Sequence, residues 1–301
     1  MMYEINMILS GIWLQFRQIG LYWVSGLVAG SLVSVFLSEN IITKMLKLGS
    51  GKAAFLPLLA SSLLGIVSPL CMYGTVPIIA ALGKKGLPHY LLASFMVSSI
   101  LLNPNIFLFT FALGSSLAIM RFLLCLLSGF LAGLLILLFF ANKELFSFEK
   151  FTNSKDDETA AKNKTFFKDL FKALRITFPY LLIGITLSTL FERYVDPSFI
   201  SGFFGERQGL GVLFATTISI PLYVCGGGTI PLIRAWMHAG MGTGEVMAFM
   251  LSGPALKINN ISAVKMILGT KNFLLYLLYC ILFAVLSGWI IEFSLKLIYN
   301  N

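Results

Sequence analysis

Charge and histidine are scarce in this chain. Only 12% of its 301 residues are charged, and just two are histidine. The four cysteines form neither a CxxC pair nor the spacing of a disulfide framework, so the sequence predicts no metal site. It also lacks a Walker motif, and we expect no bound cofactor. Because no catalytic dyad is recognisable, we expect no enzyme, and an intramembrane enzyme is the remote alternative.

Apolar side chains take the place of charge. The residues are 57% hydrophobic and the mean hydropathy is +0.88, outside the usual range of soluble globular domains. A helix needs ~20 apolar residues to cross a bilayer. Charge-free stretches cover 18–38, 53–83, 86–120, 122–142, 208–233 and 272–291. The sequence therefore predicts an all-α polytopic membrane protein in the lipid bilayer, with about 8–10 transmembrane segments and broken helices.

The basic residues are placed as topology signals. The formal net charge is +9, but lysines and arginines are scattered at the ends of apolar segments, so we expect no nucleic-acid partner. The hydrophilic stretch 142–172 holds seven of the 22 lysines and arginines, which favours a cytoplasmic position. No lysine or arginine precedes Arg17, so we expect no signal peptide. We predict a first transmembrane repeat at 1–141, a hydrophilic linker at 142–165 and a second repeat at 166–301.

The two halves repeat one another at an offset of 154 residues. Between 71 and 105 this offset gives 12 identities in 35 positions without a gap. The identical pairs are Cys71/Cys225, Gly74/Gly228, Thr75/Thr229, Pro77/Pro231, Ile79/Ile233, Ala81/Ala235, Gly86/Gly240, Phe95/Phe249, Met96/Met250, Ser98/Ser252, Leu102/Leu256 and Asn105/Asn259. The same offset places 117–140 over 271–294. Repeats with a helix break in each half are typical of secondary transporters, and the sequence leaves open whether the copies are parallel or inverted.

Each half has a first helix break in the same phrase, "CMYGTVP" and then "CGGGTIP". Glycine permits backbone angles that other residues avoid, threonine can cap a new helix, and proline fits its first turn. We therefore expect one helix to end and another to start at each phrase. The residues are Gly74, Thr75 and Pro77 in the first half, and Gly226, Gly227, Gly228, Thr229 and Pro231 in the second. A helix N-terminus inside the membrane favours anions or lone-pair donors.

A second pair of breaks follows, in "SSILLNPN" and "SGPALKINN". Pro104 and Pro254 are expected to interrupt the helices at different places. Four polar residues lie at these breaks. At the offset of 154 residues, Asn103 aligns with Lys257 and Asn105 aligns with Asn259. Polar side chains at membrane depth mark a solute pathway or a paired partner. For Lys257 the alternative is an interfacial lysine that reaches water.

Cys71 and Cys225 stand three residues before the glycine of each first break. A thiol near a helix N-terminus is deprotonated more easily, and thiolates are soft ligands that suit soft metalloids or thiol-reactive solutes. The alternative is a buried cysteine that only packs. Cys125 and Cys280 miss each other by one position in the 154-residue register, so we expect these two to be packing residues.

Two charged residues of the second half are candidates for coupling transport to protons. Arg234 follows Pro231 by three residues, which predicts a position near the break. Glu245 is a candidate proton-carrying carboxylate, and the alternative is a residue that only stabilises a helix start after Thr243.

The phrase Cys-x-x-Gly-(Thr)-x-Pro, followed by a glycine-bounded loop and a Phe-rich helix in both halves, resembles the ArsP-type predicted permease family. The resemblance covers nearly the whole chain. It implies a multi-pass permease of the bacterial inner membrane that exports trivalent organoarsenicals such as methylarsenite. It also implies that Cys71 and Cys225 are the thiols nearest the substrate.

We therefore expect a secondary transporter, driven by protons, that exports a small soft or thiol-reactive solute. The alternative is a transporter of a small anion bound at the half-helix N-termini. The candidate substrate-binding residues are Cys71, Gly74, Thr75, Pro77, Asn103, Asn105, Cys225, Gly226, Gly227, Gly228, Thr229, Pro231, Lys257 and Asn259.

Overall fold

The computed structural model contains helices in both halves of the chain. It describes residues 54–68, 72–84, 86–140, 143, 145–147, 210–223, 229–238 and 240–299, with scattered residues in 6–28 and 171–186. The helices of the first half are α3 (Phe55–Val67), α4 (Met72–Lys84), α5 (His89–Leu101), α6 (Pro104–Thr110), η2 (Phe111–Leu113) and α7 (Ser115–Phe139). Those of the second are α10 (Leu210–Leu222), α11 (Thr229–His238), α12 (Thr243–Leu256) and α13 (Ile258–Tyr299). No strand occurs in these parts of the chain, which confirms the helical fold class.

Several of these helices are long and apolar enough to cross a membrane. They are α7, with a mean hydropathy of 2.8, and Ala263–Leu297 of α13, with 2.4. His89–Leu101 and Ile106–Leu113, which meet at a bend of 46°, make a third span if the pair crosses as one. Within the described residues the structure thus has two or three such spans, while about 8–10 for the whole chain stays a prediction.

The residue pattern of α7 explains how it packs. Its buried face carries small or polar residues, namely Ala118, Arg121, Cys125, Ser128, Gly129, Ala132 and Gly133. Its exposed positions carry large aliphatic residues, among them Ile119, Leu123, Leu127 and Leu138. Small residues let neighbouring backbones approach closely within a membrane, and large apolar side chains suit contact with lipid. One face of α7 is therefore built for helix contact and the other for the bilayer.

Two glycines of α7 show how close this contact is. A Cβ at Gly129 would lie 2.9 Å from the carbonyl oxygen of Ser94, and one at Gly133 would lie 2.7 Å from that of Tyr90. Both carbonyls belong to α5. Three serine hydroxyls donate to carbonyls of neighbouring helices, Ser61 to Leu91, Ser62 to Leu126 and Ser94 to Leu58. We call α3, α5 and α7 the three-helix unit, because backbone contacts and hydroxyl bonds join each to the others.

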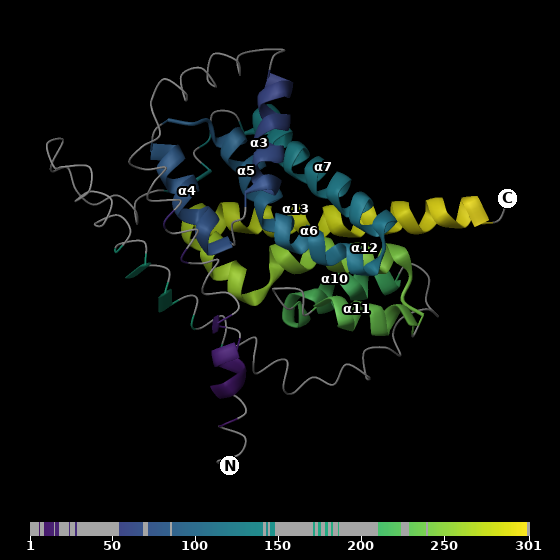
Figure 1. Ribbon diagram of the computed structural model, residues 1–301. Coiled ribbons are helices and arrows are strands. Elements are labelled where there is room, and N and C mark those ends of the chain that lie inside the picture. Colours follow the sequence, from purple (N-terminus) through teal and green to yellow (C-terminus); the bar gives the residue numbers. More distant parts are fainter. Residues whose placement is uncertain are drawn as a thin grey trace, which may run out of the picture.

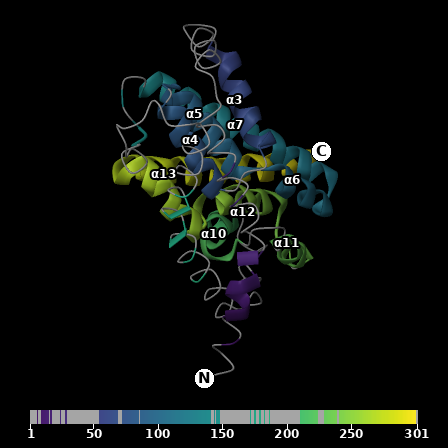
Figure 2. The same cartoon turned by 60° about the vertical axis from the view of Figure 1, so that its left-hand side comes forward.

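The helices pair in the same way in both halves. In the first half α3 packs on α5 and α7, and α4 packs on α5; in the second α10 packs on α12 and α13, and α11 packs on α12. The long α13 runs between the two groups, with α3, α4 and α5 on one side and α10 and α11 on the other (Figure 1). The rotated view keeps this arrangement (Figure 2). The repeat boundaries themselves stay predictions.

The register of the last helix differs from the expected one. Gly114 and Gly269 both have positive φ, 131° and 67°, and each precedes a long apolar helical stretch. They lie 155 residues apart, as do Gly133 and Gly288. A Cβ at Gly133 would meet Leu58 and the Tyr90 carbonyl, and a Cβ at Gly288 would meet Val212 and the Gly244 carbonyl, which are the counterparts of Leu58 and Tyr90 at the offset of 154.

The prediction that 117–140 aligns with 271–294 is therefore wrong by one residue. The second half has one more residue between its second break and the glycine that starts the last helix. With this correction Cys125 and Cys280 correspond. Both are buried free thiols, as expected of packing residues.

Candidate functional site

Part of the predicted site lies outside the described residues. This holds for Cys71, Cys225, Gly226, Gly227 and Gly228, and for the side chains of Asn105, Pro231 and Asn259. Their role in binding stays a prediction.

The first break takes a different form from the one expected. Gly74 lies within α4, and Pro77 is inside that helix, beyond its first turn. Thr75 does not act as the start of a new helix there. It is fully buried, and its hydroxyl shares a hydrogen bond of 3.0 Å with the Ser99 hydroxyl of α5. α3 ends at Val67 and α4 starts at Met72, inside the phrase, so a helix does start there, but Gly74, Thr75 and Pro77 lie within it and not at its start as expected. A proline inside a helix removes one backbone bond, which neighbouring helices can offset in a membrane.

The second breaks lie at corresponding positions. Asn103 separates α5 from α6, and its Oδ1 accepts a hydrogen bond of 2.9 Å from the Ile106 amide, so it caps α6 with Pro104 in the first turn. Its counterpart Lys257 separates α12 from α13 and is only 1% exposed. Pro254 does not interrupt the helix, because α12 continues to Leu256. The helix changes direction at Lys257 instead.

The described part of α11 begins at Thr229. α11 spans Thr229–His238, and residues 224–228 lie outside the described residues, so the helix start expected at Thr229 and Pro231 stays a prediction. Thr229 is buried. A small void of about 10 Å³ lies against this end of α11 and is lined by Thr229, Ile230 and Ile233. This is the volume that a single water-sized group occupies.

Arg121 also lines this void. It lies on the buried face of α7 and is 1% exposed. Its Nη1 donates to the Thr110 hydroxyl at 2.9 Å, and its Nη2 donates to the Tyr223 hydroxyl and the Met250 carbonyl, both at 3.2 Å. Thr110 ends α6, while Tyr223 and Met250 belong to the second half. Arg121 therefore joins the two halves next to the start of α11.

The described residues around Arg121 do not neutralise its charge. A guanidinium has five N–H donors, and three bonds to neutral oxygens use only part of them. Its Nε is buried and has no hydrogen-bond partner among the described residues. Within the same residues the one ion pair joins Lys296 to Glu292, at 3.7 Å. Burying an unpaired charge costs several kcal/mol, so a buried arginine without a carboxylate marks a functional position.

Arg121 was missed in the sequence, although a signal exists. It separates the charge-free stretches 86–120 and 122–142, which makes it resemble a residue at the end of a span. However, it follows Ala118 by three residues and precedes Cys125 by four. This spacing places all three on one helical face, and the small neighbours indicate a buried face.

The two predicted coupling residues have structural roles in the described contacts. Arg234 is exposed and donates to the Ala112 carbonyl of η2 at 2.6 Å. Glu245 is 4% exposed, and its Oε2 accepts a hydrogen bond of 2.9 Å from the Gly242 amide at the start of α12. Glu245 therefore stabilises the start of α12, and its role in proton coupling stays a prediction. A second carboxylate lies close by, because a Cβ at Gly244 would be 3.2 Å from Oε2 of Glu292.

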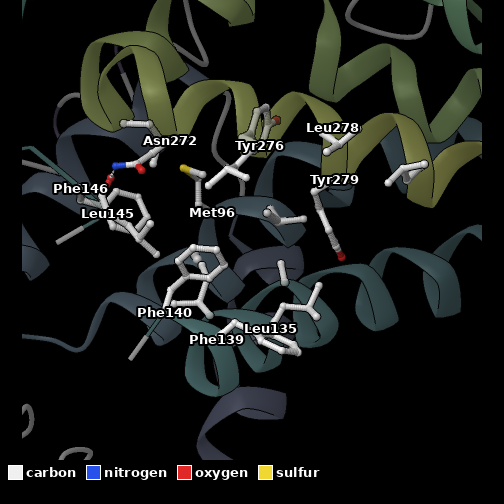
Figure 3. Close-up of a pocket in the computed structure, with 17 residues that line it drawn as sticks. Met96, Leu135, Phe139, Phe140, Leu145, Phe146, Asn272, Tyr276, Leu278 and Tyr279 are labelled. Carbon is white, nitrogen blue, oxygen red and sulfur yellow. Dashed lines mark hydrogen bonds between the residues drawn. The ribbon is translucent and has the colours of Figure 1, made fainter. Parts of the chain in front are cut away.

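A larger cavity lies between α5, α7 and α13 (Figure 3). Its volume is about 280 Å³, and its walls are nearly all carbon, with Met96, Leu135 and Phe139 among them. The polar side chains that reach it are already bonded: Asn272 to the Leu145 carbonyl, Tyr276 to the Ala255 carbonyl and Tyr279 to the Ser128 carbonyl. This cavity suits an apolar group, whereas the void at Arg121 suits a charged one.

Comparison with known proteins places this chain in a family of predicted permeases. The model of the ArsP-type predicted permease family matches residues 6–293. The UPF0718 protein YcgR of Bacillus subtilis is 24% identical over 276 residues, 87% of this chain and 89% of that protein. A putative two-component membrane permease complex subunit of Streptococcus mutans is 26% identical over 282 residues, 87% of this chain and 90% of that protein.

A shorter match is to a UPF0718 protein of Methanocaldococcus jannaschii, 30% identical over 142 residues. It covers 47% of this chain and 38% of that relative, so the chain spans well under two thirds of its length. No solved structure matches the chain.

Proposed function

The chain belongs to the ArsP-type predicted permease family, and we propose that it is a secondary transporter whose solute passes between Arg121 and the start of α11. A permease moves solute through the membrane, so its site must lie inside the protein and between its halves. The observation that carries this proposal is Arg121, a buried cation beside α11 whose Nε has no hydrogen-bond partner among the described residues. Its hydrogen bonds reach both halves, so a movement of one half against the other changes its surroundings.

For the solute, we propose a soft or thiol-reactive compound, with a trivalent organoarsenical as the first to test, exported across a bacterial inner membrane. Cys71 directly precedes the first residue of α4, and Cys225 lies four residues before the first residue of α11. Both thiols therefore belong to the segments that lead into the two helices. Soft metalloids bind thiolates more strongly than they bind hydroxyl oxygens.

Uptake into everted membrane vesicles tests this substrate. We expect methylarsenite uptake by the parent chain and loss of most of it in Cys71→Ser and Cys225→Ser, because serine preserves the volume but not the soft ligand. The matched control is Cys280→Ser, which exchanges a buried thiol on α13 and should keep uptake. Normal uptake by the Cys71/Cys225 double variant at parental expression would exclude thiol binding of the solute.

A small anion is the second candidate, and the charge of Arg121, which no carboxylate of the described residues pairs, favours it. For such a solute the four cysteines are incidental. The same vesicles distinguish the two candidates, because uptake of sulfite or another small oxyanion should survive both serine variants and fail in Arg121→Gln. If the parent chain takes up neither class of solute in this assay, both proposals are contradicted.

We further propose that protons drive the transport and that Glu245 and Glu292 take part. Glu292 lies beside Gly244, the residue before Glu245, and its Oε2 is buried without a hydrogen-bond partner in the described part of the chain, while its Oε1 pairs with Lys296 at 3.7 Å. Two carboxylates that share a site hold a proton more tightly than one alone. Such a pair can bind and release a proton as the protein changes conformation.

A further inference from the structure

Arg121 carries a charge that its described neighbours leave unbalanced. Its contacts at the guanidinium are a threonine hydroxyl, a tyrosine hydroxyl and a backbone carbonyl, all of them neutral. The remaining walls of the void at this point include Ile106, Phe109 and Met250. Apolar walls raise the cost of a buried charge, because they offer no compensating dipole. An ion of opposite sign at this point would lower that cost.

The void also touches α11. Thr229 and Ile230, the first two described residues of this helix, line it together with Ile233. Among the described residues that line the void, Arg121 alone carries a charge. The void therefore adjoins a buried guanidinium, which favours a negatively charged occupant.

The size of the void limits what can occupy it. A volume of about 10 Å³ admits one water-sized atom or group and excludes a whole polyatomic anion. We propose that this void is an anion-binding site that takes either a halide ion or a single oxygen of an oxyanion. The inference deepens the proposed function and rests on it for the location of the solute. Binding itself is measured without any transport.

Thermal unfolding of the purified full-length protein in detergent tests the site. The protein is titrated with sodium chloride, bromide, nitrate or acetate, each balanced with sodium gluconate so that ionic strength stays fixed. We expect a saturable rise of the unfolding temperature of about 3 °C at a tenfold excess over Kd. Chloride and bromide acting alone would identify a free halide, whereas nitrate and acetate acting alone would identify an oxyanion oxygen.

Variants connect the response to Arg121. Arg121→Gln should remove the anion-dependent rise, and Lys265→Gln, which deletes an exposed charge on α13, should keep it. If Arg121→Gln does not fold, Arg121→Lys is measured instead. It keeps a positive charge but lacks the planar guanidinium, so it should bind the anion with weaker affinity. An anomalous bromide peak next to the guanidinium would support the site directly.

Identical unfolding temperatures of the parent chain in all five salts would overturn the proposal, and so would an unchanged response in Arg121→Gln. Either result would leave the methylarsenite uptake assay as an independent test of the proposed function. Conversely, a chain that binds bromide but transports nothing would refute the proposed function and not the site. The two failures are therefore distinguishable.

Discussion

The Arg121 guanidinium donates a hydrogen bond of 3.2 Å to the hydroxyl of Tyr223, which lies 102 residues further along the chain. Arg121 belongs to α7 in the first half, and Tyr223 directly follows α10 in the second. The Tyr223 ring fits against Gly253 of α12, where a Cβ would lie within 3 Å of the ring atoms. One tyrosine thus fixes the position of the arginine relative to two helices of the other half.

Removing this hydroxyl should weaken the contact between the halves. In Tyr223→Phe the ring still packs on Gly253, but Arg121 loses one acceptor. We expect the free energy of unfolding to fall by about 1 kcal/mol, since bonds to charged groups are worth somewhat more than neutral ones and this one is long. Thermal unfolding in detergent measures the change. Tyr223→Phe with parental stability would show that the bond contributes nothing.

Asn103 should act as a helix cap rather than as a solute ligand. Asn103→Ala removes the acceptor for the Ile106 amide and should cost about 1 kcal/mol of stability. Asn103→Ser supplies another capping oxygen and should restore both stability and transport. Stability and vesicle uptake are measured on the same preparations. A serine variant that is stable but inactive would instead assign Asn103 to the solute pathway.

Gly269 should resist replacement because of its backbone angles. Its φ of 67° and ψ of 174° fall in a region that is essentially reserved for glycine, so Gly269→Ala should destabilise the protein by about 1–3 kcal/mol. Its counterpart Gly114, with φ of 131°, should behave alike. No atom lies within 4 Å of a Cβ at either position, so the loss would come from the backbone and not from a clash. Comparable stability of Gly269→Ala and the parent would contradict this account.

The carboxylate pair gives a prediction about pH. Glu245→Gln keeps an oxygen for the Gly242 amide and removes the ability to carry a proton. We expect the variant to fold and to lose the stimulation of uptake by an imposed pH gradient. Glu245→Ala serves as the control for the helix cap, since it should also lower stability. Gradient-dependent uptake that persists in Glu245→Gln would exclude this residue from proton coupling.

The sequence was sufficient to predict the helical class and the break at Asn103. Each depends on a local signal, such as apolar length, a capping side chain or a proline in a first turn. At the first break the local rules of Gly74, Thr75 and Pro77 predicted the helix start too late in the chain, because α4 already starts at Met72. The Thr75 hydroxyl, expected to cap the helix, instead bonds to Ser99 of α5, and α4 continues through its proline.

Arg121 was missed for a related reason. A lone arginine between two apolar stretches marks a span end in most sequences, and only its partners show otherwise. Those partners, Tyr223 and Met250, come from the other half of the chain and carry no pattern that links them to Arg121. The one-residue change of register at Gly269 was hidden too, because apolar helices align almost equally well at neighbouring offsets.

The three-helix unit and the cavity beside it divide the protein mechanically. In the unit, glycine contacts and serine hydroxyls fix α5 against α3 and α7, so sliding one helix past another would break bonds and force backbones together. Between this unit and α13 lies about 280 Å³ of carbon-lined space, bridged by the hydrogen bond from Tyr279 to the Ser128 carbonyl. Displacement of the unit against α13 should therefore break fewer contacts than displacement within the unit, so we expect the three helices to move as one rigid body and Tyr223 to transmit that motion to the second half.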